Sequence, residues 1–186
     1  MHAAQMLKGG GVGVIPTDTL YGLVASATNE AAVRRVYALK QRSLTKPCII
    51  LISSLDDLTL FDITPTGEQE KTLATYWPGP TSVVLACGVE VPEYLHGGTH
   101  TLALRLPADP ALQALLHESG PLIAPSANPE GLPPATTLEE ARAYFGDSVD
   151  FYLEGGVRTG APSTLITLDA AGATTLLRAG RVPGVQ

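Results

Sequence analysis

The chain has 186 residues, a net charge of −6, 45% hydrophobic residues and 16% charged residues. This composition predicts one packed domain over residues 1–186 and excludes a disordered chain, and the acidic balance disfavours a protein that coats nucleic acid by bulk electrostatics. No apolar run approaches the ~20 residues that cross a bilayer, and residues 1–10 lack the apolar core of a signal peptide, so we expect a cytoplasmic protein without membrane contact. Cys48 and Cys87 lie in apolar runs, which predicts buried free thiols.

The first predicted elements are a helix that ends near Lys8 and a buried strand from Val12 to Ile15. Three glycines, residues 9–11, lie between them. A phosphate-binding glycine loop follows a strand and precedes a helix, whereas this run follows a helix and precedes a strand. We therefore interpret it as a helix stop.

The segment PTDTLYGL, residues 16–23, follows that strand and is rich in hydroxyl groups. Pro16 ends the strand because proline has no N–H to donate, which leaves Thr17, Asp18 and Thr19 at the strand's carboxyl end. Open α/β sheets bind their ligands at such ends. On this segment alone, a polar turn that merely caps the strand explains the residues equally well.

Helices and strands are interleaved along the rest of the chain, and some strands follow one another directly. The predicted helices begin at capping residues. Asn29 caps a helix through Lys40, Ser54 begins a brief helix, and Thr66 caps a helix that ends near Trp77. Asp109 begins a helix that ends at Gly120, and Thr137 forms a capping box with Glu140 for a helix that ends at Gly146. Further strands are predicted at residues 47–52, 81–86, 101–106, 121–125, 149–153, 163–168 and 173–177. This pattern predicts one α/β domain with a mixed sheet.

The segment KQRSLTKP, residues 40–47, carries three cations and no acid. Lys40, Arg42 and Lys46 lie between the end of a helix and the start of a strand, where they can surround a polyphosphate from several sides. Isolated cations on an acidic protein suggest a local pocket for an anion. A solvated basic face is the alternative.

Two segments in the middle of the chain contain residues that limit the backbone conformation or require a charged partner. WPGPT, residues 77–81, is a rigid turn for which we favour a structural role. In TLALRLP, residues 101–107, period-two alternation places Thr101, Ala103 and Arg105 on one face of a strand. An arginine on an apolar strand requires a partner, which is either a ligand carboxylate or phosphate or an internal carboxylate.

The last third of the chain adds hydroxyl, amide and cationic groups. SANPEG, residues 126–131, follows an apolar strand and lacks the glycine frame of a nucleophile elbow. Ser163 opens a strand and suits a hydrogen bond to a carboxylate or phosphate. Arg178 and Arg181 place two cations about Gly180.

Taken in order, the segments PTDTLYGL, K-x-R-x-x-x-K-P, WPGPT, R-x-P, SAN and S-T resemble the motifs of the YrdC family of threonylcarbamoyl-AMP synthases, over nearly the whole chain. The resemblance implies a twisted open mixed β-sheet flanked by helices, with a central concave cavity. It implies a nucleotidyltransferase that joins L-threonine, bicarbonate and ATP to give threonylcarbamoyl-AMP and pyrophosphate. The product serves the N6-threonylcarbamoyladenosine modification of tRNA, which a separate downstream transferase complex completes.

The resemblance also implies roles for individual positions. The contacts implied for threonine are Thr19, Arg105, Ser126 and Ser163. The contacts implied for ATP are Arg42, Lys46, Thr101, Asn128, Thr136 and Arg178, and Lys40 joins Arg42 and Lys46 as a catalytic cation at the phosphates. Two positions depart from the family pattern. Leu51 stands where some members carry a histidine, and Glu130 replaces a usual serine.

The implied chemistry depends on positioning and charge stabilisation more than on a dedicated base. Mg²⁺ is the expected cofactor and is carried with ATP, and no protein metal site is predicted. Asp18, the one acid in the motifs apart from Glu130, either orients its loop, which we favour, or helps to hold Mg²⁺. His96 and His100 flank two glycines, but the spacing offers no third metal ligand.

Two other functions remain open at this point. The same fold serves in hydrogenase-maturation carbamoyltransferases, which handle a carbamoyl-adenylate without threonine, although the short, single-domain length argues against that role. The second alternative is an RNA-binding protein without catalysis, which a concave surface permits and the acidic net charge disfavours. Weak RNA binding beside catalysis is compatible with the same surface.

Overall fold

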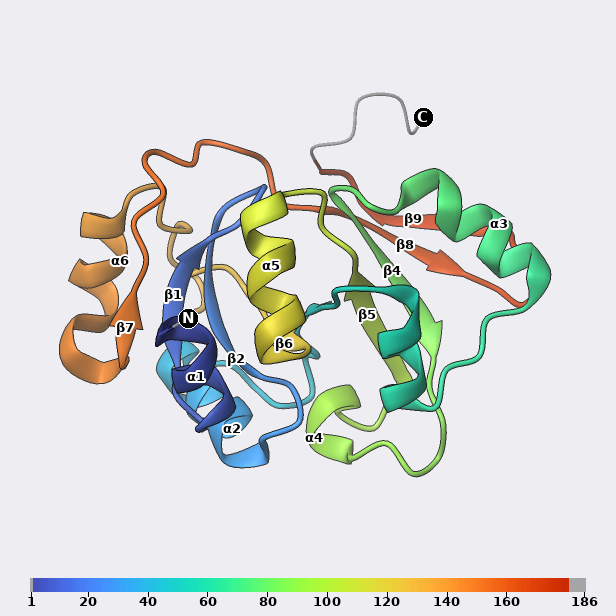
Figure 1. The fold of residues 1–186 in the computed structure, drawn as a ribbon, viewed down its shortest axis with the longest axis horizontal. Coiled ribbons are helices and arrows are strands. Elements are labelled where there is room, and N and C mark those ends of the chain that lie inside the picture. Colours follow the sequence, from blue (N-terminus) through green and yellow to red (C-terminus); the bar gives the residue numbers. More distant parts are fainter. Residues whose placement is uncertain (1, 181–186) are drawn as a thin grey trace.

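The chain folds into a mixed β-sheet with helices on both faces (Figure 1). The structure is a computed structural model, and it describes residues 2–180. Within these residues, nine strands form one sheet in the order β7-β1-β2-β6-β3-β5-β4-β8-β9. The pairs β1–β7, β3–β5 and β4–β8 are parallel, and the remaining neighbours are antiparallel. The predicted mixed α/β sheet is therefore present.

The element bounds agree with most of the predicted segments. The strands are β1 (Gly13–Pro16), β2 (Tyr21–Ser26), β3 (Ile50–Leu51), β4 (Thr81–Ala86), β5 (Thr101–Arg105), β6 (Leu122–Ile123), β7 (Phe151–Tyr152), β8 (Thr164–Leu168) and β9 (Thr174–Arg178). The helices are α1 (His2–Lys8), α2 (Glu30–Lys40), α3 (Gly67–Tyr76), α4 (Glu93–His96), α5 (Pro110–Ser119) and α6 (Leu138–Phe145), with short 3-10 helices at Leu55–Phe61 and Gly146–Ser148. In residues 2–180, no helix has the length and apolar character that crossing a bilayer requires.

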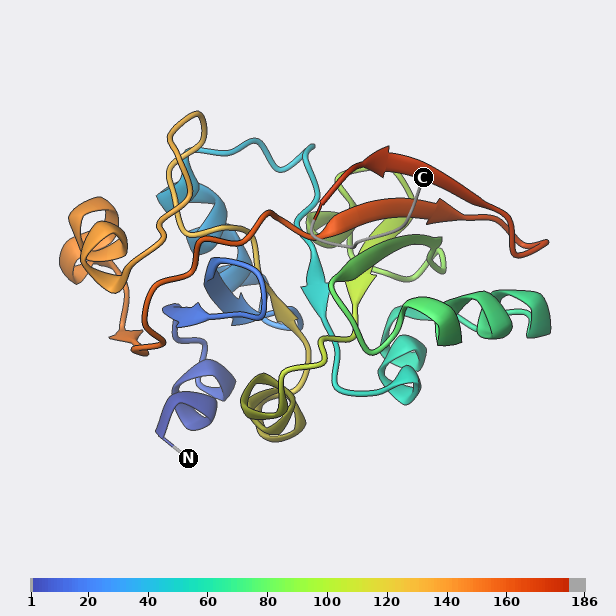
Figure 2. The same cartoon turned by 90° about the horizontal axis from the view of Figure 1, so that it is seen from above.

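Apolar layers cover both faces of the sheet. Helices α1 and α5 lie side by side over one face, as both views show (Figures 1 and 2). That layer buries Leu7 of α1, Leu116 of α5 and Leu122 of β6, each at 0% exposure. Helix α2 covers the opposite face beside β2, where Val33 and Val36 join the larger core cluster. Strand β2 is consequently buried on both faces.

Strand β2 and the short helix α4 were not predicted from the sequence. All six residues of β2 are buried, so the strand lacks the alternation that marks a half-exposed strand. Strands β1 and β2 pair antiparallel, with Pro16 opposite Tyr21. Residues 17–20 therefore form the turn of a β-hairpin. Thr17 and Thr19 do follow the carboxyl end of β1, as predicted, and the turn holds them in a fixed loop.

Side-chain caps begin the longer helices at the predicted residues. Asn29 and Asp109 accept N–H bonds from the first turns of α2 and α5. The capping box predicted for α6 is only half correct. Thr137 accepts from the backbone N–H of Glu140 at 3.2 Å, but the Glu140 carboxylate accepts from the N–H and hydroxyl of Thr136, at 2.7 and 2.9 Å. The carboxylate thus binds one residue earlier than a capping box requires.

Both cysteines are free thiols, as predicted. Cys48 is buried, whereas Cys87 is only half-buried, which corrects the expectation that both are buried. In the WPGPT turn, the Trp77 indole N–H donates to the carbonyl of Thr81 at 2.8 Å, so the two ends of the segment are bonded to each other.

Leu116→Ala is expected to lower the free energy of unfolding by about 2–5 kcal/mol, because it leaves a cavity between α5 and the sheet. Leu177→Ala is the matched control on strand β9, where the leucine is 54% exposed. We expect the control to change stability by no more than about 0.5 kcal/mol. Urea unfolding followed by circular dichroism measures both. Equal effects of the two substitutions would contradict the assignment of α5 to a core layer.

Candidate functional site

A cavity of about 190 Å³ lies where the β1–β2 turn, the end of β5 and the segment after β6 meet. Its lining includes predicted site residues from segments spread over nearly the whole chain: Thr19, Arg42, Arg105, Ser126, Ser163 and Arg178. All four residues predicted to contact threonine are among them. Clefts that hold drug-sized ligands enclose roughly 300–1,000 Å³. The enclosed space therefore suits a ligand about the size of an amino acid.

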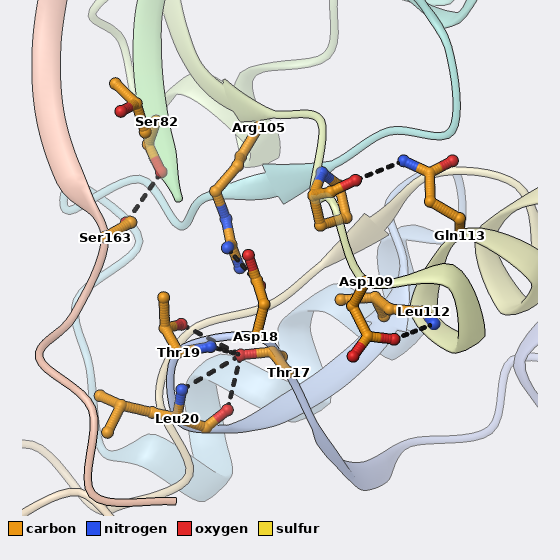
Figure 3. Close-up of polar contacts among 12 residues, drawn as sticks. Thr17, Asp18, Thr19, Leu20, Ser82, Arg105, Asp109, Leu112, Gln113 and Ser163 are labelled. Carbon is orange, nitrogen blue, oxygen red and sulfur yellow. Dashed lines mark hydrogen bonds and ion pairs between the residues drawn. The ribbon is translucent and has the colours of Figure 1, made fainter. Parts of the chain in front are cut away.

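One buried hydroxyl holds the β1–β2 turn (Figure 3). Thr17 Oγ1 donates to the carbonyl of Leu20 at 2.6 Å, and it accepts from the backbone N–H groups of Thr19 and Leu20, each at 3.2 Å. The Thr19 hydroxyl lies 3.0 Å from the same oxygen. These bonds fix the turn, so the Thr19 hydroxyl has a defined place on the cavity wall.

Arg105 forms a buried ion pair with Asp18. Its Nη1 donates to Asp18 Oδ1 at 2.5 Å, and the two side chains are 4% and 17% exposed. Figure 3 shows them pointing toward each other from β5 and the β1–β2 turn. An internal carboxylate therefore partners Arg105, as one of the two sequence-based alternatives allowed. The buried Nε of Arg105 has no hydrogen-bond partner among residues 2–180. A buried donor without a partner is costly. Because this nitrogen is itself buried, it is not open to a ligand in the cavity.

Arg178 reaches the cavity from the end of β9. Its Nη2 donates to the carbonyl oxygen and to Oγ of Ser163, at 2.9 and 3.3 Å. The Ser163 hydroxyl in turn lies 2.9 Å from that of Ser82. Burial, and then the positive charge of Arg42, lowers the pKa of Arg178. The two guanidinium groups are thus close enough to repel each other, and an anion between them would relieve that repulsion.

Hydrogen bonds within residues 40–47 orient the guanidinium of Arg42. Its Nε donates to the carbonyl of Lys46 at 2.9 Å and its Nη2 to that of Pro47 at 3.4 Å. Three guanidinium groups, those of Arg42, Arg105 and Arg178, therefore line one cavity. Among the described residues, Arg105 is the one of the three that forms a salt bridge, and its partner is Asp18. The cavity wall has excess positive charge and is suited to an anionic ligand.

Lys40 lies beneath the loop that follows β6 and is not part of the cavity wall. It is 2% exposed, and its ammonium group donates to the carbonyls of Ser126 and Asn128, at 2.6 and 2.7 Å. Burial lowers the pKa of Lys40 to about 8. The geometry gives Lys40 a structural role, in which it joins the end of α2 to this loop. A phosphate contact would require these bonds to open.

The polar atoms of Asn128 are likewise engaged within the loop. Ser126 Oγ donates to Asn128 Oδ1 at 2.6 Å, and Asn128 Nδ2 donates to the carbonyls of Pro129 and Leu132, at 3.0 and 2.7 Å. These bonds place the Ser126 hydroxyl at the cavity. The contact of Asn128 with ATP stays a prediction.

The other residues predicted to contact ATP lie outside this cavity wall. Lys46 is exposed and forms a 2.7 Å salt bridge with Glu130, the residue that replaces the usual serine. Hydrogen bonding to the Lys46 ammonium lowers the pKa of Glu130. Thr136 is bonded to the start of α6, and Thr101 is the first residue of β5, whose last residue lines the cavity. Their contacts with ATP also stay predictions.

Tyr21 makes a contact that the sequence analysis does not predict. Its hydroxyl donates to the carbonyl of Gly156 at 2.8 Å and accepts from the N–H of Gly155 at 3.0 Å. These glycines are more than a hundred positions away in the chain, so no local pattern indicates the pairing. Tyr21 thereby fixes the segment that leads toward the cavity from β7. Of the remaining predictions, Leu51 is fully buried under α1 and α5 and is not on the cavity wall, and Arg181 lies outside the described residues.

Metal ligands do not gather in this part of the molecule. Within residues 2–180, no three His, Cys, Asp or Glu side chains are placed to hold a metal ion. The rings of His96 and His100 stack with 4.7 Å between their centroids, and His96 Nδ1 accepts from the N–H of Gly98 at 3.1 Å.

Comparisons with known proteins give one family over nearly all of the described residues. A family model described as "Telomere recombination" (Sua5_yciO_yrdC) matches residues 5–180. The chain is 36% identical over 183 residues to a Pyrococcus abyssi protein named threonylcarbamoyl-AMP synthase, covering 97% of this chain and 54% of that protein. It is 36% identical over 161 residues to a protein of the same name from Nitrosococcus oceani, covering 85% and 87%. This chain thus spans about half the length of the P. abyssi relative.

Solved structures confirm the predicted fold. The structure of P. abyssi Sua5 in complex with L-threonine matches with a TM-score of 0.88 and 35% identity, over 96% of this chain and 53% of that one. The structure of E. coli YciO matches with a TM-score of 0.84 and 25% identity, over 96% and 87%.

Lys40→Met is expected to destabilise the protein, because it leaves buried carbonyl groups without their donor. The folded-state pKa of about 8 lies below the value of 10.5 for a free lysine, so between these values the unfolded chain binds the additional proton. Linkage then raises the unfolding free energy of the wild-type protein as the pH rises through this window. The added stability is lost again as the pH falls to 8.

The difference in unfolding free energy between wild type and Lys40→Met should therefore widen as the pH increases from 8 toward 10.5. Urea unfolding at steps across this window measures it. Lys71→Met, at a lysine whose side chain is 73% exposed, is the matched control and should show no such trend. A difference that narrows with pH would contradict the role given to Lys40.

Proposed function

We propose that this chain, which belongs to the Sua5/YciO/YrdC family, joins L-threonine, bicarbonate and ATP to give threonylcarbamoyl-AMP and pyrophosphate. The observation that carries the proposal is the cavity itself. It combines three guanidinium groups with the hydroxyls of Thr19 and Ser126 in a space about the size of an amino acid. The relatives named threonylcarbamoyl-AMP synthase and the threonine complex of P. abyssi Sua5 support the same substrate.

The proposed site has two parts. The enclosed part takes threonine, whose carboxylate is attracted by the positive charge of Arg105 on the cavity wall. The phosphates of ATP lie between Arg42 and Arg178, because these two cations repel each other until an anion separates them. An amino acid and a nucleotide together exceed the enclosed volume, so the nucleoside extends toward the cavity mouth.

The proposed chemistry needs alignment more than acid or base groups. The threonine amine and bicarbonate form a carbamate and release water. A carbamate oxygen then attacks the α-phosphorus of ATP, and the bond to the leaving pyrophosphate breaks. Negative charge shifts onto the phosphate oxygens during this step, where Arg42 and Arg178 would stabilise it.

Mg²⁺ is proposed to accompany ATP. The two carboxylates in the motif segments are already paired, Asp18 with Arg105 and Glu130 with Lys46. The phosphates and water would therefore supply most of the ligands of the cation, whose charge offsets that of the leaving pyrophosphate.

The product is a mixed anhydride of a carbamate and a phosphate, and it is therefore an activated acyl donor. We propose that a tRNA-modifying transferase consumes it to form N6-threonylcarbamoyladenosine. Direct RNA binding by this chain should be weak, because its net charge of −6 opposes association with a polyanion.

The purified protein is expected to release pyrophosphate only when ATP, bicarbonate, L-threonine and Mg²⁺ are all present. A coupled pyrophosphate assay, with each component omitted in turn and Mg²⁺ removed by chelation, tests this. Release without threonine would show that the amino acid is not a substrate of the reaction. No release with the complete mixture would indicate a binding function. Either result would contradict the proposal.

Arg42→Ala is expected to reduce kcat/KM for ATP by about 10²-fold, because it removes one stabilising cation from the phosphates. Lys46→Ala should also weaken the use of ATP. Arg34→Ala is the matched control, since Arg34 lies on α2, is 54% exposed and pairs with Glu30. Steady-state kinetics with varied ATP measures all three. Normal turnover by both the Arg42 and the Lys46 variant would show that the phosphate assignment is wrong.

A further inference from the structure

The side chain of Lys46 is held by an acid from a distant part of the chain. Its ammonium lies 2.7 Å from Oε1 of Glu130, which is 84 positions further along. The backbone of the same lysine is fixed at its carbonyl, which accepts from Arg42 Nε at 2.9 Å and from the Tyr37 hydroxyl at 3.3 Å. The lysine stem therefore starts from a fixed point, and the contact with Glu130 determines where its ammonium lies.

Backbone bonds hold Glu130 at this position independently of the salt bridge. Its N–H donates to the carbonyl of Lys40 at 2.7 Å, which attaches the residue to the last residue of α2. The Lys40 ammonium donates in return to the carbonyl of Asn128, at 2.7 Å. The carboxylate is thus presented to the basic segment, residues 40–47, by two bonds between that segment and the loop after β6. It needs no ion pair to be there.

The Glu130 carboxylate lies in the field of every cation of this segment. Hydrogen bonding to Lys46 lowers the pKa of Glu130. The positive charges of the segment lower the same pKa further, namely those of Lys46, Arg42 and Lys40. One of these cations, Arg42, lines the cavity. Glu130 is therefore an internal anion among the cations from which the proposed phosphate position is built.

We propose that Glu130 competes with the phosphates of ATP for Lys46 and so limits the affinity for ATP. A phosphate that takes the place of the carboxylate must first break the salt bridge. A phosphate that uses the two remaining ammonium protons lies beside the carboxylate, and the like charges repel each other. The carboxylate opposes a phosphorylated ligand in both cases. This inference rests on the proposed function and adds to it a residue that determines the strength of ATP binding.

The exposure of the pair keeps this competition moderate. The Lys46 and Glu130 side chains are 58% and 33% exposed, so water screens their attraction. The salt bridge therefore opens to a ligand that carries several negative charges. We expect the carboxylate to weaken ATP binding by about fivefold and not by orders of magnitude.

The test compares wild type with Glu130→Gln, which keeps the shape of the side chain and the backbone bond but removes the charge. Isothermal titration calorimetry measures ATP with Mg²⁺, and NMR titration measures adenosine, which has no phosphate. Glu130→Gln should bind ATP about fivefold more tightly at about 0.05 M KCl, and the ratio should fall toward one at about 0.5 M, because salt screens exposed charges. Its affinity for adenosine should stay within about twofold of wild type.

A double-mutant cycle locates the effect at Lys46. In the Lys46→Ala background, Glu130→Gln should improve ATP binding by less than about twofold, because the salt bridge is already absent. Glu68→Gln is the matched control, since Glu68 also forms an exposed salt bridge, with Lys71 at 2.6 Å, and is not on the cavity wall. It should leave ATP binding unchanged.

Several results would overturn the inference. Weaker binding of ATP by Glu130→Gln would indicate that the carboxylate assists the ligand, as a group that holds Mg²⁺ does, and unchanged binding would show that it has no effect. A full gain in the Lys46→Ala background, or an equal gain in Glu68→Gln, would reduce the effect to net charge. A parallel gain for adenosine would indicate a changed cavity shape.

Failure of this inference is distinguishable from failure of the proposed function. A wild-type protein that binds no ATP would overturn the proposed function, and the inference with it. ATP binding that does not respond to Glu130→Gln would overturn the inference alone. ATP binding that responds as expected, in a protein that releases no pyrophosphate from the complete mixture, would overturn the proposed function alone.

Discussion

The ion pair between Asp18 and Arg105 is the contact on which the site depends. It joins the β1–β2 turn to the end of β5, two segments 87 positions apart in the chain. Loss of one partner from such a buried pair leaves a charge without compensation and typically costs about 3–5 kcal/mol. The pair therefore fixes the turn against the sheet, and it holds the Arg105 guanidinium at the cavity wall. A structural contact and a binding group are thus parts of the same side chain.

The remaining cations are held in a different way. Arg42 and Arg178 donate to backbone carbonyls, which are neutral and cannot cancel a full charge. Their repulsion persists in the folded chain and favours any anion that fits between them. The overall charge of −6 is therefore a poor guide to this site, since the field inside the cavity depends on the nearest side chains. An acidic protein can bind a polyphosphate when its cations converge in this manner.

Much of this arrangement was predictable from the sequence because it depends on local patterns. Caps such as Asn29 and Asp109 act within one helical turn, and the polar segments at strand ends are contiguous. Strand β2 was missed because burial on both faces removes the alternation that identifies a strand. The phosphate role expected for Lys40 rests on its basic neighbours in the sequence and stays a prediction. The Lys40 ammonium donates to the carbonyls of Ser126 and Asn128, which lie 86 and 88 positions away in the chain. No local sequence pattern indicates so distant a contact.

Glu130 links the two segments that border the proposed phosphate position. Its carboxylate binds Lys46, while its backbone N–H donates to the carbonyl of Lys40 at 2.7 Å. The salt bridge is exposed, so solvent screens it and it adds little to stability. Phosphate oxygens, which carry more charge than one carboxylate, would displace Glu130 from Lys46 at small cost. The backbone bond from Glu130 to Lys40 does not involve either charged group. The loop that contains Glu130 therefore stays in place when Lys46 binds phosphate instead of Glu130.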